Sequence, residues 1–242
     1  MGKQIPNFFT LLNLVFGCLS ITNSFSNNQD WAAYFIGFAA IADFLDGFLA
    51  KKLNATSRLG KELDSLADMV SFGVAPAAML YHMIKYPYME GLSMGDYAKL
   101  LGIAHFACYL AYLITVFSAI RLAKFNVDED QEHEFKGLPT PANALFISYL
   151  FLLTKADLWG LKGYILNPFF LVLLTIVLCY LLVSKIPMFS MKFQTYSWGE
   201  NKIKYIFLLI SLALLIQFSL VGIPLIILLY MILSIVKSVA RI

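Results

Sequence analysis

Charged residues are scarce in this chain of 242 residues: Asp, Glu, Lys and Arg make up 14%, whereas 60% of the residues are hydrophobic. A soluble domain usually carries about a quarter charged residues, so the composition excludes that class and indicates a polytopic membrane protein. Basic runs interleaved with aromatic residues are also lacking, and the net charge is only +3. We therefore expect no nucleic-acid partner.

Cysteine is equally rare, and internal repeats, low-complexity tracts and polar linkers are lacking. Each cysteine lies within an apolar stretch and none has the spacing of a metal site, so buried reduced thiols are expected. The three are Cys18, Cys108 and Cys179. Without a linker to divide the chain, we expect one membrane domain over residues 1–242.

Long apolar runs, by contrast, are abundant. A helix needs around 20 residues to cross about 30 Å of hydrocarbon. The last apolar run, residues 205–236, is too long for one span. Gly222 and Pro224, which disfavour a continuous helix, lie near its middle, so we divide the run there. The sequence therefore predicts an all-α fold with eight membrane-spanning helices, over residues 7–24, 31–52, 63–84, 97–124, 141–156, 167–185, 204–219 and 222–238.

Lysine and arginine are distributed unevenly between the predicted loops. If the N-terminus lies inside, fourteen of these residues fall on the inner side and four on the outer side. Cytoplasmic loops keep the positive charges, so both termini are predicted to be cytoplasmic. We expect a multi-pass protein of the cell membrane, embedded in the lipid bilayer. The helix ends near residues 43–68, which carry four aspartates, are then predicted to face the cytoplasm.

Four aspartates lie at the ends of two predicted helices. A carboxylate in hydrocarbon costs about 3 kcal/mol, so each must be paired, hydrated or bound to a cation. The acidic and small residues recur at helical spacing, which places each set on one helix face. The first set is Asp43, Asp46, Gly47 and Ala50, and the second is Gly60, Asp64 and Asp68.

A short polar loop joins these two segments, so an antiparallel helix pair can bring the carboxylates together. Such a cluster repels itself unless cations neutralise it. Hard divalent ions prefer oxygen ligands, and two ions bridged by a shared carboxylate would bind a diphosphate. The small residues would let a ligand approach the backbone closely. An ion or proton transporter is the alternative, although the acids gather at one surface.

The pattern DxxDGxxA followed by GxxxDxxxD resembles the signature of the CDP-alcohol phosphatidyltransferases. These integral membrane enzymes displace CMP from a CDP-activated lipid with an alcohol. The resemblance implies two divalent cations, Mg²⁺ or Mn²⁺, held by Asp43, Asp46 and Asp64. It implies that Asp68 is both a further ligand and the base that accepts the proton of the attacking hydroxyl.

The same resemblance implies a site for the nucleotide of CDP-diacylglycerol. Lys51 stands where the family commonly has arginine, so the charge is kept but the bidentate fork is lost. Asn7 and Thr10 resemble first-helix positions that support the nucleotide, or they simply begin a helix. The implied nucleotide-binding residues are Asn7, Thr10, Gly47, Ala50, Lys51 and Gly60.

Three further stretches, at residues 60–77, 121–126 and 135–144, resemble the phosphatidylserine synthase branch of the family. This resemblance implies a catalytic core over 5–145, additional transmembrane helices over 146–242, L-serine as the acceptor and a homodimer. The cations expected to hold the serine carboxylate or the lipid phosphate are Arg58, Arg121, Lys124 and Lys136. Two alternatives stay open: another acceptor, such as glycerol 3-phosphate or inositol phosphate, and a metal-ion transporter.

Overall fold

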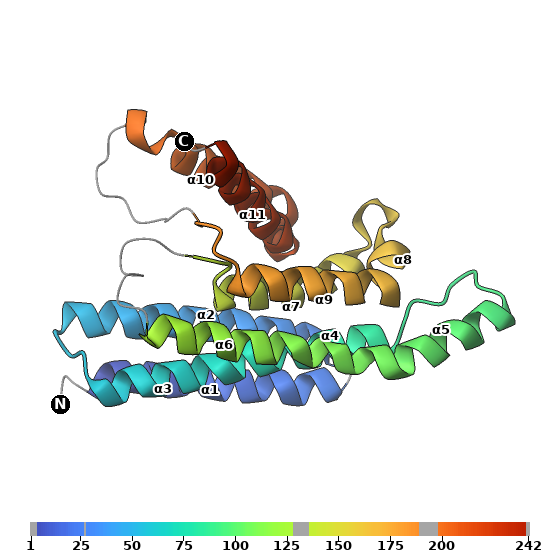
Figure 1. The fold of residues 1–242 in the computed structure, drawn as a ribbon, viewed down its shortest axis with the longest axis horizontal. Coiled ribbons are helices and arrows are strands. Elements are labelled where there is room, and N and C mark those ends of the chain that lie inside the picture. The colour runs from blue at the N-terminus through green and yellow to red at the C-terminus, as the bar shows by residue number, and fades with distance from the viewer. Residues whose placement is uncertain (1–3, 27, 128–135, 189–197, 241–242) are drawn as a thin grey trace.

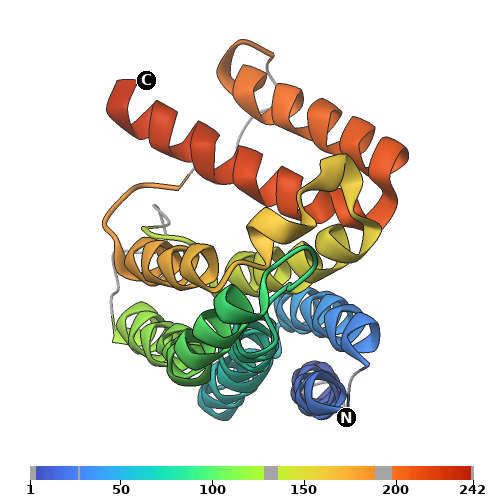
Figure 2. The ribbon, with the colours of Figure 1, turned by 90° about the vertical axis from the view of Figure 1, so that its right-hand side faces the viewer.

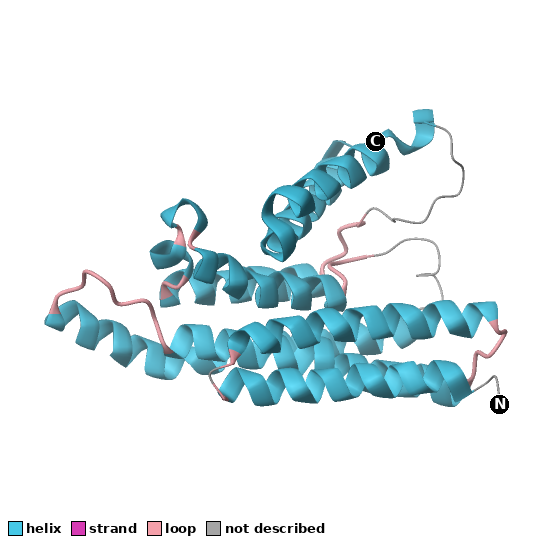
Figure 3. Cartoon of the chain, turned by 180° about the vertical axis from the view of Figure 1, so that it is seen from behind, coloured by secondary structure: helices cyan, strands magenta, loops and turns pink. Residues whose placement is uncertain are grey.

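The computed structural model describes residues 4–26, 28–127, 136–188 and 198–240. Within these ranges every regular element is a helix, and the strand pairing is limited to one bridge between Lys136 and Pro187 (Figure 3). The all-α fold class predicted from the sequence is confirmed.

The first three predicted spans are continuous helical rods. The first is α1 (Gln4–Phe25) and the second is α2 (Gln29–Lys52). The third rod begins with α3 (Arg58–Asp68), widens into the π-helix η1 (Met69–Val74) and continues as α4 (Ala75–Lys85). It starts five residues before the predicted 63–84 because the Ser57 hydroxyl caps the helix, accepting a hydrogen bond from the Gly60 amide at 3.0 Å.

The remaining helices lie within a few residues of the other predicted spans, except that α10 begins at Trp198, before the predicted 204–219. Pro168 begins α9, where its fixed φ suits a first helical position, and Asn167 caps that helix. The elements are α5 (Met94–Ala107), η2 (Cys108–Tyr112), α6 (Leu113–Val127), α7 (Thr140–Ala156), η4 (Leu158–Gly160), α8 (Lys162–Ile165), α9 (Pro168–Val183), α10 (Trp198–Phe218), η5 (Ser219–Gly222) and α11 (Ile223–Ala240).

Five helical stretches within the described residues are long and apolar enough to cross a membrane. The last of them folds back at η5, where Ser219 has a φ of 51°, so α10 and α11 lie antiparallel (Figures 1 and 2). The shorter apolar helix α9 has 16 residues. The five stretches are Gln4–Phe25, Gln29–Lys52, Arg58–Lys85, Met94–Val127 and Asn201–Val236.

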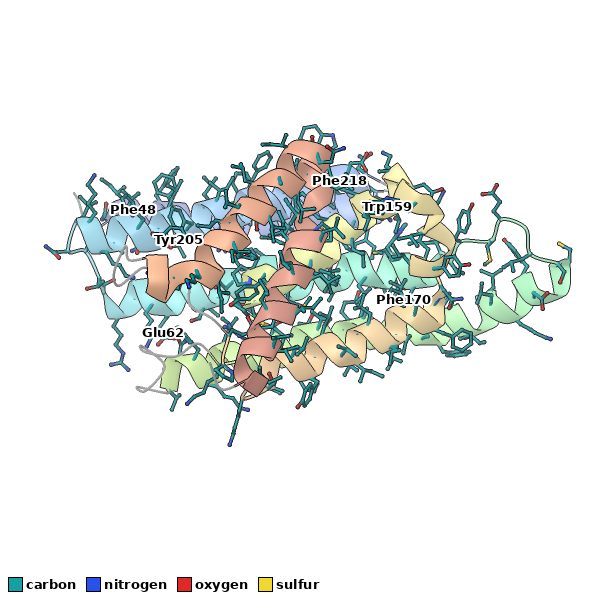
Figure 4. All side chains as sticks on the ribbon, turned by 90° about the horizontal axis from the view of Figure 1, so that it is seen from above. Phe48, Glu62, Trp159, Phe170, Tyr205 and Phe218 are labelled. Carbon is teal, nitrogen blue, oxygen red and sulfur yellow. The ribbon has the colours of Figure 1, made fainter. Side chains whose placement is uncertain are left out.

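Helix α7 is the centre of the bundle. It packs against α2, α4 and α11, and its side chains join both buried apolar clusters. Large apolar residues elsewhere point outward, among them Phe48 and Phe170, as expected for helices surrounded by lipid (Figure 4). The helices α10 and α11 cross the bundle obliquely above α7 (Figure 1).

One end of the bundle gathers the segments that carry the predicted site. The C-terminal ends of α2, α6 and α9 lie there, together with the N-terminal ends of α1, α3 and α7 (Figure 1). Phe48 and Glu62 mark this end, and Trp159 marks the opposite one (Figure 4). The fold therefore collects residues from six helices into one region.

Candidate active site

The aspartates of α2 and α3 meet at this end of the bundle. Carboxylate oxygens of Asp43, Asp64 and Asp68 all lie within 4.8 Å of one another. Asp46 lies one turn nearer the end of α2 and, with Asp64, lines an adjoining cavity. Asp64 thus belongs to both groups and joins the three-carboxylate cluster to the cavity.

These carboxylates lack positive partners. No lysine or arginine among the described residues forms an ion pair with them. One oxygen of Asp46 and one of Asp64 are buried and have no hydrogen-bond partner in the described part of the chain. Buried carboxylates in this state repel one another and have lost their hydration, so a bound cation or proton would stabilise them. A donor set made entirely of oxygens fits a hard divalent ion.

Asn13 of α1 is the residue that holds Asp68. Its side-chain amide donates a hydrogen bond to Asp68 Oδ1 at 3.0 Å, and both side chains are buried, with 0% and 8% exposed. Sequence reasoning missed Asn13. The available signal was its position three residues after Thr10 in an otherwise apolar segment, on the helix face that carries Thr10.

The first cavity has a volume of about 570 Å³ and opens between α1, α2 and the start of α3. A Cβ added to Gly47 would meet no described atom within 4 Å, so this glycine leaves space in the cavity wall. A Cβ at Gly60 would lie 3.1 Å from Asn7 Oδ1, so that glycine lets α3 approach α1 closely. The predicted residues that line this cavity are Asn7, Thr10, Asp46, Gly47, Ala50, Arg58, Gly60 and Asp64.

Lys51 is the predicted nucleotide-binding residue that the structure does not bring to this cavity. Its side chain is exposed beyond the cavity wall. Lys61 lines the cavity instead, although the sequence analysis did not select it. Lys61 also donates a hydrogen bond to the backbone oxygen of Asn126 at 3.3 Å, which ties α3 to the end of α6.

A second cavity, of about 710 Å³, lies between the ends of α6 and α9 and the segment before α7. Arg121 is anchored there by a hydrogen bond from Nη1 to the Thr140 hydroxyl at 3.4 Å, whereas its buried Nε has no partner in the described residues. The cations that line this cavity are Arg121, Lys124, Lys136 and Lys185. Three of these were predicted, while Arg58, the fourth predicted cation, lines the first cavity.

Gly137 fixes the wall of the second cavity. Its φ of 75° is left-handed, and its amide donates to the Ile186 carbonyl oxygen at 2.9 Å. A Cβ at this position would lie 2.8 Å from the Leu182 carbonyl oxygen, so the segment fits against the end of α9 only as glycine. This contact, with the bridge between Lys136 and Pro187, brings Lys136 to the chain segment that carries Lys185.

A family model described as CDP-alcohol phosphatidyltransferase matches residues 3–181 of the chain. The chain belongs to the CDP-alcohol phosphatidyltransferase family. The matched region includes all four aspartates, the first cavity and Arg121. Ser184 and Lys185, which complete the second cavity, lie just beyond the matched residues.

Relatives of this CDP-alcohol phosphatidyltransferase carry the name CDP-diacylglycerol–serine O-phosphatidyltransferase. The Bacillus subtilis relative is 34% identical over 184 residues, which cover 76% of this chain and 89% of the relative. The Methanocaldococcus jannaschii relative is 32% identical over 221 residues, which cover 91% of this chain and 85% of the relative. The Helicobacter pylori (strain J99) relative is 35% identical over 150 residues, covering 61% of this chain and 57% of the longer relative.

The rod of α3, η1 and α4 contacts both α1, which lines the first cavity, and α6, which lines the second. It packs against α1 on one side and against α6 on the other (Figure 2). The Thr115 hydroxyl of α6 donates to the Gly73 carbonyl oxygen at 3.1 Å, and the Asn126 amide donates to the Ser65 hydroxyl at 2.7 Å. Asp68 therefore lies on a rod that is fixed from both sides.

Proposed function

We propose that this chain transfers the phosphatidyl group of CDP-diacylglycerol to L-serine and releases CMP. The observation that carries the proposal is the group of three carboxylates, Asp43, Asp64 and Asp68, beside a cavity whose wall contains Asp46. The membership in the family supports the reaction type, and the names of the relatives support serine as the acceptor.

The four aspartates would hold two divalent cations, Mg²⁺ or Mn²⁺. When bound, such cations neutralise a diphosphate and stabilise the negative charge that develops on a departing phosphate. The unpartnered buried oxygens of Asp46 and Asp64 support this assignment, because the described residues offer them no hydrogen bond or cation.

The first cavity would receive the cytidine diphosphate end of the lipid. Gly47 and Gly60 allow the ligand to approach the backbone, and Arg58 and Lys61 place positive charge near its phosphates. Thr10 and Asn7 offer polar groups from α1. Lys51, which is exposed next to Ala50, would act at the mouth of the cavity through its charge.

Asp68 would act as the general base for serine. The serine hydroxyl oxygen forms a bond to the phosphorus that carries diacylglycerol, the bond between this phosphorus and the CMP oxygen breaks, and the hydroxyl proton passes to Asp68. Arg121, with Lys124 and Lys136, would bind the serine carboxylate in the second cavity. The buried, unpartnered Nε of Arg121 supports this role.

For the whole chain we propose eight crossings, both termini in the cytoplasm and a location in the cell membrane, with the site facing cytosolic serine. The fourteen-to-four distribution of lysine and arginine supports this orientation. We further propose a homodimer and a single membrane domain. Its catalytic core is 5–145, and the additional helices of 146–242 supply Ser184 and Lys185 to the second cavity.

A phosphorylated alcohol, such as glycerol 3-phosphate or inositol phosphate, is the second candidate acceptor. The four cations of the second cavity favour it, because this much positive charge exceeds what one carboxylate needs. A metal-ion transporter is disfavoured, since the acidic cluster lies at one end of the bundle.

The decisive experiment measures CMP release from CDP-diacylglycerol by the purified protein in detergent micelles, with Mg²⁺ or Mn²⁺ and a panel of alcohols. We expect release with L-serine, loss of release in excess chelator and recovery when the metal is restored. Release that depends on a phosphorylated alcohol and ignores serine would overturn the acceptor. Full release in chelator would overturn the metal centre, and no release with any alcohol would overturn the enzyme assignment.

A further inference from the structure

Asn13 has an unused hydrogen-bonding group beside the proposed base. Its side chain is 0% exposed, and Nδ2 donates to Asp68 Oδ1 at 3.0 Å. The other end of the same planar amide, Oδ1, is also buried and has no hydrogen-bond partner among the described residues. A buried acceptor without a partner costs about 1–3 kcal/mol, so its retention in a packed helix pair requires a reason.

The neighbouring hydroxyl groups do not supply the missing donor. The Thr10 hydroxyl donates to a carbonyl of its own helix at 3.2 Å, and the Ser71 hydroxyl does the same in the third rod at 2.7 Å. The backbone cannot shift easily either, because a Cβ on Gly17 would lie 2.8 Å from Ser71 Cα. One turn beyond Asn13, therefore, α1 and η1 are already in close contact. The amide is held in place with its oxygen unpaired.

We propose that Asn13 positions Asp68 and that its Oδ1 accepts a hydrogen bond from the ammonium group of the acceptor amino alcohol. This inference rests on the proposed function. Serine carries its hydroxyl and ammonium groups on adjacent carbons. When the serine hydroxyl meets Asp68, the ammonium group therefore lies within reach of Asn13, which contacts Asp68.

Residues of α1 and α6 would then recognise different parts of one substrate. Asn13 reaches Asp68 from α1, and Arg121 lines the second cavity from α6. The ammonium would meet a neutral carbonyl oxygen and the acidic cluster, and the carboxylate would meet a guanidinium. A site built to bond a polar group rejects an analogue that lacks it, because the buried partner is then left unpaired.

The test compares two acceptors, L-serine and 3-hydroxypropionate, which is serine without its amino group. The wild-type protein should prefer serine by at least about 100-fold in kcat/KM. Asn13→Leu removes both amide groups at similar volume. It should lower this preference by about 10- to 100-fold and reduce kcat with serine, while the KM for CDP-diacylglycerol stays within about twofold. A ratio between two acceptors does not depend on the fraction of folded protein.

Asn23→Leu is the matched control. It makes the same substitution in α1, where the Asn23 side chain donates to the Leu19 carbonyl oxygen of its own helix at 2.8 Å, away from the aspartates. The acceptor preference should therefore stay at the wild-type value. Should Asn13→Leu fail to fold, Asn13→Ala serves in its place, with binding of CMP in the presence of Mg²⁺ as the measure of an intact first cavity.

An unchanged preference in a folded Asn13 variant would overturn the inference, as would equal use of the two acceptors by the wild type. Either result leaves serine transfer by the wild type intact. Failure of the wild type to use serine would instead overturn the proposed function.

Discussion

Gly137→Ala is the substitution whose effect follows most directly from the geometry. Alanine at a φ of 75° costs about 1–2 kcal/mol, because its Cβ crowds the following carbonyl oxygen. The new Cβ would also lie 2.8 Å from the Leu182 carbonyl oxygen and 3.0 Å from two others, of Leu181 and Ser184. Backbone atoms cannot rotate away as a side chain can, so the segment must move.

That movement breaks two backbone hydrogen bonds, each 2.9 Å long, from the Gly137 amide to the Ile186 carbonyl oxygen and from the Leu138 amide to the Leu181 carbonyl oxygen. At about 0.5–1.5 kcal/mol for each bond, added to the strain, the total destabilisation is about 2–5 kcal/mol. Gly91→Ala is the matched control. Its φ is 79°, but a Cβ there would meet no described atom within 4 Å, so about 1–2 kcal/mol is expected.

Thermal unfolding of the detergent-solubilised protein measures the difference. For a chain of this length each kcal/mol shifts Tm by about 2–4 °C, so Gly137→Ala should unfold roughly 2–12 °C below Gly91→Ala. The serine KM should also rise for Gly137→Ala, because Lys136 leaves the second cavity, while the KM for CDP-diacylglycerol is unchanged. Equal Tm values for the two variants would refute the predicted clash and loss of hydrogen bonds, because the cost of a positive φ alone would then explain both variants.

Three other perturbations test separate parts of the site and the fold. Gly47→Leu should leave Tm within about 1 °C of the wild type yet raise the KM for CDP-diacylglycerol at least about tenfold by filling the first cavity; a large loss of Tm would mean that this space is needed for packing. Asp68→Asn should retain binding of CDP-diacylglycerol while transfer falls by roughly 10² to 10⁴, and loss of lipid binding would contradict its role as the base. In intact cells an impermeant thiol reagent should label Glu90→Cys, at the end opposite the site, and spare Lys52→Cys; the reverse pattern would invert the proposed topology.

The sequence was sufficient for the features that depend on local spacing. Helical periodicity alone placed Asp43, Asp64 and Asp68 on facing surfaces, and the structure brings their carboxylates together. Apolar run lengths placed the helices, apart from the starts of α3 and α10, which lie before their predicted spans. At α3 the cap at Ser57 begins the helix outside the apolar window. These features depend on residues that lie close together in the chain.

The features that the sequence analysis missed depend on contacts between distant residues. Asn13 meets Asp68 across 55 positions, and Lys185 reaches the second cavity because Gly137 fits against the end of α9. Spacing along α1 could place Asn13 on the face that carries Thr10, but spacing within one sequence names neither contact partner. Lys51 was predicted to line the first cavity but does not. Its position in the motif suggested a place in the cavity wall, whereas its side chain is exposed and only the neighbouring Ala50 lines the cavity.

The π-helical turns of η1 determine how the third rod is rotated. Asp68 ends α3 facing Asn13, and after six residues of wider turns Ala75 begins α4 facing the apolar core. Each residue of an ordinary α-helix advances the rod by about 100°, so deleting one residue from Met69–Val74 would rotate Asp68 away from α1 while α4 kept its packing. This short segment thus sets the angular phase between the chemistry at one end of the rod and the membrane-embedded core at the other.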